Sequence, residues 1–215
     1  MLINLLFQGQ AVLFLLIVIA LVISLTFHEF GHALTAKLFG DDTAQRAGRL
    51  TLNPAAHIDP LGLLMVVLIG FGYARPVPTN PANYKSRWAD LAVSSAGPAM
   101  NLLVAAFATN FYAVAMEMQW GFMLGRGPYI FFNYLAMINL VLMVFNLIPL
   151  GSLDGHYILP YFLSRRLATS YRAFNAQYGN LALLALVALS FVGIPVFAFV
   201  MQVGNALLPL ITFIG

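Results

Sequence analysis

Residues 5–39 read LLFQGQAVLFLLIVIALVISLTFHEFGHALTAKLF, an apolar run that ends in a group of polar side chains. From Ala11 onward this run is longer than the roughly 20 apolar residues that cross a bilayer. Its second half contains His28, Glu29 and His32. Such side chains are costly within a membrane unless they are paired or ligated. The run therefore predicts a membrane helix that carries a buried polar site.

The rest of the 215-residue chain has the same apolar character, with 61% hydrophobic and 8% charged residues. Soluble domains are about 45–50% apolar and about 25% charged, so this composition excludes a cytosolic globule, a disordered chain and a coiled coil. The chain has no cysteine, which excludes disulfides, a cysteine nucleophile and a Cys-based zinc site. A net charge of +3 on so few charged residues gives no reason to expect a nucleic-acid partner. The partner implied by composition is the lipid bilayer.

The chain divides into apolar segments joined by shorter polar ones. No polar block is large enough for a soluble domain, so we predict one membrane domain over residues 1–215, with a core at 20–165 and a C-terminal helical hairpin at 178–214. Gly193-Ile194-Pro195 interrupts the last segment, and a single kinked helix is the alternative there. Within the most polar part, Arg49 to Leu52 is predicted as a short strand. The apolar segments are 5–39, 61–73, 91–118, 129–150 and 178–214.

Segment 61–73 decides the topology. Its 13 residues cover about 20 Å as a helix, less than the roughly 30 Å of a bilayer core. If it dips in and returns, nine of the ten Lys and Arg residues share one face and only Arg126 lies opposite. By the positive-inside rule this places the N-terminus outside and residues 37–90 and 151–176 in the cytoplasm. We therefore predict an all-α polytopic membrane protein with four to five transmembrane helices, a re-entrant segment and a short membrane-associated β element.

The H-E-x-x-H motif at residues 28–32 predicts a metal site. His28 and His32 are four residues apart, so both imidazoles lie on one helix face and can reach one zinc, while Glu29 can take a proton from a water. Catalytic zinc usually has a third protein ligand and one open position. Asp154, at the end of segment 129–150, is the best candidate. It reaches the same face as the histidines only if segment 61–73 is re-entrant, so charge and ligand requirements select the same topology.

Three motifs together resemble the site-2 protease family of intramembrane zinc metalloproteases. They are the H-E-F-G-H motif in a membrane helix, the L-D-G motif that follows the N-x-x-P turn at residues 146–149, and Gly97-Pro98-x-x-Asn101 between them. Residues 48–60 and 71–78 are similar to the compact bacterial branch, so we expect neither a PDZ nor a CBS domain. The resemblance covers about residues 20–165.

This resemblance implies one zinc ion per chain, bound by His28, His32 and Asp154, with Glu29 as general base and acid. It implies regulated intramembrane proteolysis, in which transmembrane protein substrates are cut in or near the bilayer. Together with the charge distribution, it predicts an integral protein of a bacterial plasma membrane, with the active site towards the cytoplasm.

Four further residues are candidates with simpler alternatives. Asn146 is the first candidate for an oxyanion donor, or else a helix-ending Asn that satisfies freed carbonyl groups. Gly97 and Asn101 either hold substrate backbone or bridge closely packed helices. His57 is a candidate substrate contact, although a lone loop histidine is more often structural. The strand from Arg49 would pair with an unwound substrate by strand addition.

Three other interpretations are alternatives to an active protease. A zinc transporter would also place His and Asp in a membrane, but no polar path continues across this bilayer and a transporter has no use for a non-ligating Glu29. A di-iron membrane enzyme needs about eight histidines by its family pattern, and this chain has four. An inactive relative would lack catalytic residues, whereas every expected one is present.

Overall fold

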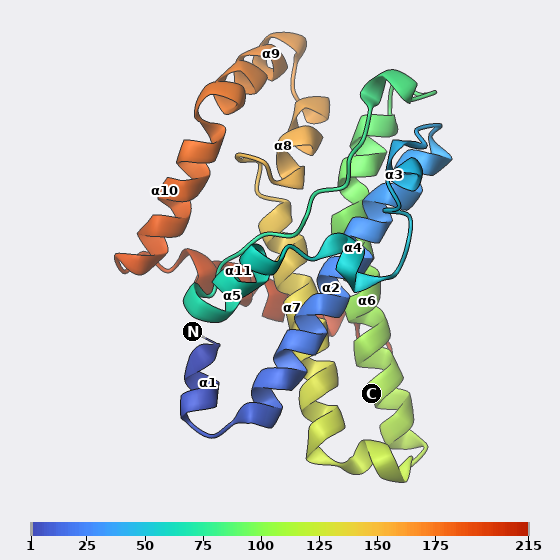
Figure 1. The fold of residues 1–215 in the computed structure, drawn as a ribbon, viewed down its shortest axis with the longest axis vertical. Helices are drawn as coiled ribbons and strands as arrows, with labels where there is room; N and C mark the ends of the chain where they lie inside the picture. Colours follow the sequence, from blue (N-terminus) through green and yellow to red (C-terminus); the bar gives the residue numbers. More distant parts are fainter. Residues whose placement is uncertain (1, 215) are drawn as a thin grey trace.

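The computed structural model describes residues 2–214, and within them the chain is helical with no strand (Figure 1). A π-helical turn at Asn175–Gly179 joins α9 to α10 without a break. The α-helices are α1 Ile3–Phe7, α2 Ala11–Leu38, α3 Thr43–Arg46, α4 Pro54–His57, α5 Pro60–Ile69, α6 Ala89–Glu117, α7 Arg126–Asn146, α8 Asp154–Ile158, α9 Arg165–Phe174, α10 Asn180–Phe191 and α11 Val196–Ile211.

Three long helices form the core, with α6 antiparallel to α2 and α7 (Figure 1). Small side chains such as Ala20, Ala105 and Ala108 are completely buried where these helices meet. Small residues let membrane helices approach closely, because lipid supplies no hydrophobic drive to bring them together. Large apolar side chains such as Phe107 remain exposed, as expected for a lipid-facing surface. The core is therefore packed as a membrane bundle.

Four helical stretches within residues 2–214 are long and apolar enough to cross a membrane: α2, α6, α7 and the continuous stretch Arg165–Phe191. This confirms an all-α protein with several membrane helices. The break at Gly193 separates two helices, α10 and α11, so the single kinked helix does not form. The first arm of the predicted hairpin begins earlier than expected, because α9 and the π-helical turn lead directly into α10.

The predicted strand from Arg49 to Leu52 is wrong, because none of the described residues form a strand. The backbone groups that a strand would offer to a partner are bonded locally instead. The Arg49 N–H donates to Ala44 O in α3, over 2.8 Å. Thr51 O accepts from Nε2 of His57 in α4, over 2.8 Å. The segment is therefore held between two helical turns and pairs with no other strand among the described residues.

Segment 61–73 contains the short helix α5, followed by a return of the chain. Gly70 ends α5 with a φ of +83°, in the left-handed region that favours glycine. A Cβ at Gly62 would overlap Tyr73 O, so the returning chain packs directly on α5. Arg75 N then donates to His57 O over 2.8 Å, close to where α5 begins. With ten residues α5 is not among the helices long enough to cross a membrane, and its insertion into the bilayer stays a prediction.

Asp41 ties the end of α2 to the segment that follows α5. Its side chain is completely buried. Its carboxylate accepts hydrogen bonds from Thr43, from Asn80 N over 2.6 Å and from Asn83 Nδ2 over 2.8 Å. Burial raises the pKa of Asp41, but these hydrogen bonds lower it more, to about 2. The carboxylate therefore stabilises the fold in its charged form.

Asp41→Asn is expected to lower the free energy of unfolding by about 1–3 kcal/mol at neutral pH, because its NH2 group would face N–H donors. The folded-state pKa is depressed from 3.8, so this stabilisation is present above about pH 4 and is lost as pH falls towards 2. Thermal unfolding in detergent across this range measures both effects. The matched control is Asp42→Asn, because Asp42 makes only an exposed ion pair with Arg46. Equal stability of Asp41→Asn and the wild type at neutral pH would show that the Asp41 carboxylate does not stabilise the fold.

Candidate metal centre

Three ligand side chains converge at the middle of the molecule. His28 and His32 lie one turn apart on α2, and Asp154 is the first residue of α8. The two Nε2 atoms are 3.1 Å apart. Nε2 of His28 lies 3.3 Å from Asp154 Oδ2, and Nε2 of His32 lies 3.3 Å from Asp154 Oδ1. The structure thus brings together the three predicted ligands, which are the one such group found among residues 2–214.

The geometry fits a zinc ion. Zinc bonds to nitrogen and oxygen at about 2.0–2.1 Å, so tetrahedral ligand atoms lie about 3.3 Å from one another. Nδ1 of His32 lies 2.7 Å from Val93 O, a group that only accepts, so this nitrogen carries a proton and Nε2 is the atom available to a metal. Asp154 Oδ2 is buried without a hydrogen-bond partner among the described residues. Bare nitrogen and carboxylate groups at this spacing are stabilised by a cation between them.

Gly97 on α6 leaves the space that the imidazole tips occupy. A Cβ there would overlap Nε2 of His32 and lie 2.6 Å from Nε2 of His28. Glycine is therefore required for the close approach of α6 to the ligands, which explains why the G-P-x-x-N motif begins with glycine.

Gly97→Ala is expected to lower zinc affinity about tenfold or more, because relief of such an overlap typically takes 1–3 kcal/mol and must displace the ligands. A chelator competition assay on the purified protein measures this. The matched control is Gly127→Ala on α7, where an added Cβ would meet nothing within 4 Å. Zinc affinity of Gly97→Ala equal to that of the control would contradict this steric account.

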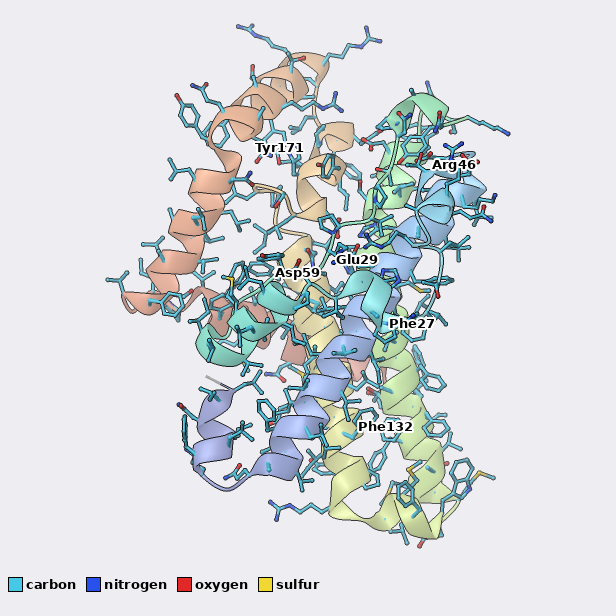
Figure 2. The ribbon with its side chains drawn as sticks, in the orientation of Figure 1. Phe27, Glu29, Arg46, Asp59, Phe132 and Tyr171 are labelled. Atoms are coloured by element: carbon cyan, nitrogen blue, oxygen red, sulfur yellow. The ribbon has the colours of Figure 1, made fainter. Side chains whose placement is uncertain are left out.

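Glu29 lies beside the ligands without being one of them. It is a residue of α2 and is buried, with 7% of its surface exposed, and Figure 2 shows it near the middle of the molecule. Its Oε2 accepts a hydrogen bond from Val77 N over 3.2 Å. This hydrogen bond orients the Glu29 side chain through the backbone of Val77.

Arg49 holds the chain that covers Glu29. It is buried, with 8% exposed, and its guanidinium donates to Pro76 O over 3.0 Å and to Arg75 O. Burial lowers the pKa of this guanidinium, and the nearby carboxylate of Glu29 partly offsets the effect. The backbone from Arg75 to Val77 is thus fixed between a cation and the carboxylate. The sequence pattern around Arg49 predicted a strand and a positive charge but not this role.

The loop that carries Asp154 is held by the stretch that joins α9 to α10. Asn175 accepts from Gly151 N and donates to Gly151 O, each over 2.8 Å. Tyr171, which Figure 2 shows between α9 and α8, donates to Pro149 O over 2.9 Å. A Cβ at Gly155 would overlap Leu147 O, which explains the glycine of the L-D-G motif. No pattern in the sequence linked Asn175 to this loop.

Of the other candidate residues, Asn101 contacts a metal ligand, whereas Asn146, His57 and His156 contact other groups. Asn101 contacts His28, with its Oδ1 2.6 Å from Nδ1 of the imidazole. Asn146 donates to Leu142 O in its own helix over 2.9 Å, as in the simpler alternative. His57 is completely buried, bonded to Thr51 O and not part of the ligand group. His156 lies 3.2 Å from Tyr171 OH and is outside the ligand group.

Comparisons with known proteins point to a common family. The family model for Peptidase family M50 matches residues 16–126 and 113–190. The protein "Putative zinc metalloprotease YwhC" of Bacillus subtilis is 45% identical over 148 residues, which cover 66% of this chain and 67% of that protein. Rip2 proteins, named in the same words, are 32% identical over 152 residues in Mycolicibacterium smegmatis and 33% over 164 residues in Mycobacterium tuberculosis.

These matches cover 66% and 70% of this chain but only 55% and 58% of the two Rip2 proteins. The chain therefore spans little more than half the length of those relatives. No solved structure matches the chain.

Proposed function

The chain belongs to peptidase family M50, the site-2 protease family, and from its ligand geometry we propose that it is an intramembrane zinc metalloprotease. In this proposal it hydrolyses peptide bonds in or near the transmembrane segments of other membrane proteins. Its relatives are named zinc metalloproteases, and its apolar helices make it an integral membrane protein.

One observation carries the proposal: a buried carboxylate that is not a ligand lies next to a two-histidine, one-aspartate site on a helix long enough to cross a membrane. His28, His32 and Asp154 would hold zinc and leave one coordination position open for chemistry. A metal carrier needs ligands only, whereas a hydrolase also needs a base. Glu29 supplies that base.

The protein's own contribution to hydrolysis follows from these contacts. Zinc, when bound, supplies Lewis acidity towards the attacking water and the scissile carbonyl. Glu29 takes the proton of the water and passes it to the leaving amine. The Val77 N–H binds Oε2 of Glu29 and so holds the carboxyl group in place for this transfer. Because Glu29 is buried, bulk water does not compete for it.

A substrate must present an extended peptide beside Glu29, where the segment from Arg75 to Val77 now lies. We propose that this segment, held by Arg49, forms one wall of the substrate path. The distribution of Lys and Arg favours a site that opens towards the cytoplasm, with the N-terminus outside. It also favours a re-entrant α5 loop, and bacterial relatives favour a bacterial plasma membrane.

The remaining candidates have separate roles in this proposal. Both amide atoms of Asn101 are bonded within the helix bundle, which favours helix bridging over a hold on substrate backbone. Asn146 would act as oxyanion donor only if its amide left Leu142 O. A substrate contact by His57 would likewise need the buried ring to be uncovered.

The proposal is tested with purified protein in liposomes that contain a panel of single-span membrane proteins. Mass spectrometry then detects new peptide termini. We expect cleavage within or near transmembrane segments, loss of cleavage with a zinc chelator, and recovery when zinc is restored. Movement of zinc across the liposome membrane without any cleavage would instead support a zinc transporter.

A further inference from the structure

A row of buried polar groups connects His28 with α7. Nδ1 of His28 lies 2.6 Å from Oδ1 of Asn101 on α6. Nδ2 of Asn101 donates to Oδ1 of Asn139 on α7 over 2.7 Å, and Nδ2 of Asn139 donates to Oγ of Ser24 over 2.7 Å. Ser24, Asn101 and Asn139 are completely buried. A ligand of the metal is thus supported by polar groups from all three core helices.

Backbone carbonyl groups fix the direction of these hydrogen bonds, because a carbonyl oxygen only accepts. One amide atom of Asn139 lies 2.8 Å from Leu135 O, so that atom is Nδ2 and the oxygen of Asn139 faces Asn101. Asn101 must therefore present its Nδ2 to Asn139, and this atom also lies 3.3 Å from Ser24 O. The oxygen of Asn101 then faces His28. Nδ1 of His28 must carry the proton of that bond.

A proton on Nδ1 leaves the other ring nitrogen of His28 free to bind metal. That atom, Nε2, lies 3.3 Å from Asp154 Oδ2 and 3.1 Å from Nε2 of His32. Metal binds the nitrogen that carries no proton. If the Asn101 amide turned over, its NH2 group would face Nδ1 and favour a proton on Nε2. The orientation of a single buried amide thus decides whether His28 can be a ligand.

We propose that Asn139 is a positioning residue of the metal centre, because it holds the Asn101 amide in the one orientation that keeps Nε2 of His28 free. Asn139 acts two hydrogen bonds away from the ligand and touches neither metal nor substrate. A helix-bridging role alone would not require this direction, since either orientation of an amide can bridge helices. The inference rests on the zinc site of the proposed function and not on proteolysis.

The test compares Asn139→Leu with Asn139→Asp in the full-length protein. Leucine removes the hydrogen bonds of Asn139 to Asn101, Ser24 Oγ and Leu135 O. Only the longer contact with Ser24 O, over 3.3 Å, then opposes a turn of the Asn101 amide. A neutral, buried carboxylic acid keeps an acceptor for Asn101 and an O–H donor for Ser24 Oγ. We expect Asn139→Leu to weaken zinc binding by about 10- to 100-fold in a chelator competition assay, as is typical when support for a ligand histidine is lost. Asn139→Asp is expected to bind zinc close to the wild-type affinity.

The ring tautomer is the second measurement. The chain has four histidines, so ¹⁵N NMR of histidine-labelled, zinc-free protein resolves few signals, and His28→Gln assigns the relevant one. We expect a protonated Nδ1 in the wild type and in Asn139→Asp, and a larger share of protonated Nε2 in Asn139→Leu. A purely structural role would not move this equilibrium. Ser24→Ala removes one of the two acceptors of Asn139 Nδ2 and leaves Leu135 O. It is expected to shift both measurements in the same direction but by less, and it provides a second test if Asn139→Leu fails to fold.

Asn110→Leu is the matched control. Asn110 also joins two helices, because its Nδ2 donates to Ala106 O over 2.8 Å and to Ile211 O over 2.7 Å, but it has no bond to the metal ligands. Folded Asn139→Leu with wild-type zinc affinity and tautomer would overturn the proposal, as would an equal loss in Asn110→Leu. A wild-type protein that binds no zinc would instead refute the proposed function itself.

Discussion

Replacing Glu29 with glutamine is expected to lower kcat by about 10²–10⁴-fold while zinc remains bound. General acid–base catalysis contributes rate factors of this size. Glutamine keeps the shape of the side chain and can still accept the hydrogen bond from Val77 N, but it cannot take a proton from water. Because Glu29 is not in the ligand group, the metal content should not change. Turnover of a cleaved transmembrane substrate in liposomes and zinc content per chain measure the two effects.

Glu117→Gln is a natural control, since Glu117 is the only other glutamate in the chain. It lies at the C-terminal end of α6, whereas the G-P-x-x-N motif lies near the beginning of that helix. Its turnover and zinc content should match those of the wild type. Undiminished turnover in Glu29→Gln would exclude Glu29 as the base, and loss of zinc would show that it is a ligand.

Asp154→Ala is expected to lose at least about 100-fold in zinc affinity, more than the 10- to 100-fold that follows loss of a supporting group. The change removes the carboxylate whose two oxygens lie 3.3 Å from the two histidine Nε2 atoms. The histidines alone would then hold the ion with two ligands, fewer than the three usual for catalytic zinc. Turnover should disappear with the metal and return only in part at high zinc concentration.

Asp59→Ala is the matched control for this prediction. Asp59 caps the N-terminus of α5 by accepting from Leu61 N over 2.9 Å and Gly62 N over 3.0 Å. Its loss should reduce stability by about 1 kcal/mol and leave zinc affinity unchanged. If Asp154→Ala bound zinc as tightly as this control, the third ligand would be elsewhere in the chain.

The sequence predicted the centre of the molecule because local rules determine it. A helix places His28 and His32 on one face, whatever surrounds them. The choice of Asp154 agreed with the side of the membrane predicted from the positive charges, a count that requires no knowledge of packing. The convergence of these three side chains is what the structure shows.

The surroundings of the site could not be predicted in the same way, because they depend on contacts between distant segments. The strand at Arg49 was wrong since hydrogen bonds from α3 and α4 use its backbone groups. Asn175 meets Gly151 only after the chain has folded back. Asn139 did carry a signal, because an amide in the middle of an apolar membrane helix needs a polar partner. What remained hidden was the identity of that partner.

Zinc K-edge X-ray absorption of the purified wild-type protein tests the central claim most directly. If His28, His32 and Asp154 hold the ion, the spectrum will show one zinc site per chain with two imidazole rings and oxygen ligands, all at about 2.0–2.1 Å. His32→Ala should then show one imidazole fewer. A protein without zinc, or a site with only oxygen ligands, would contradict the account.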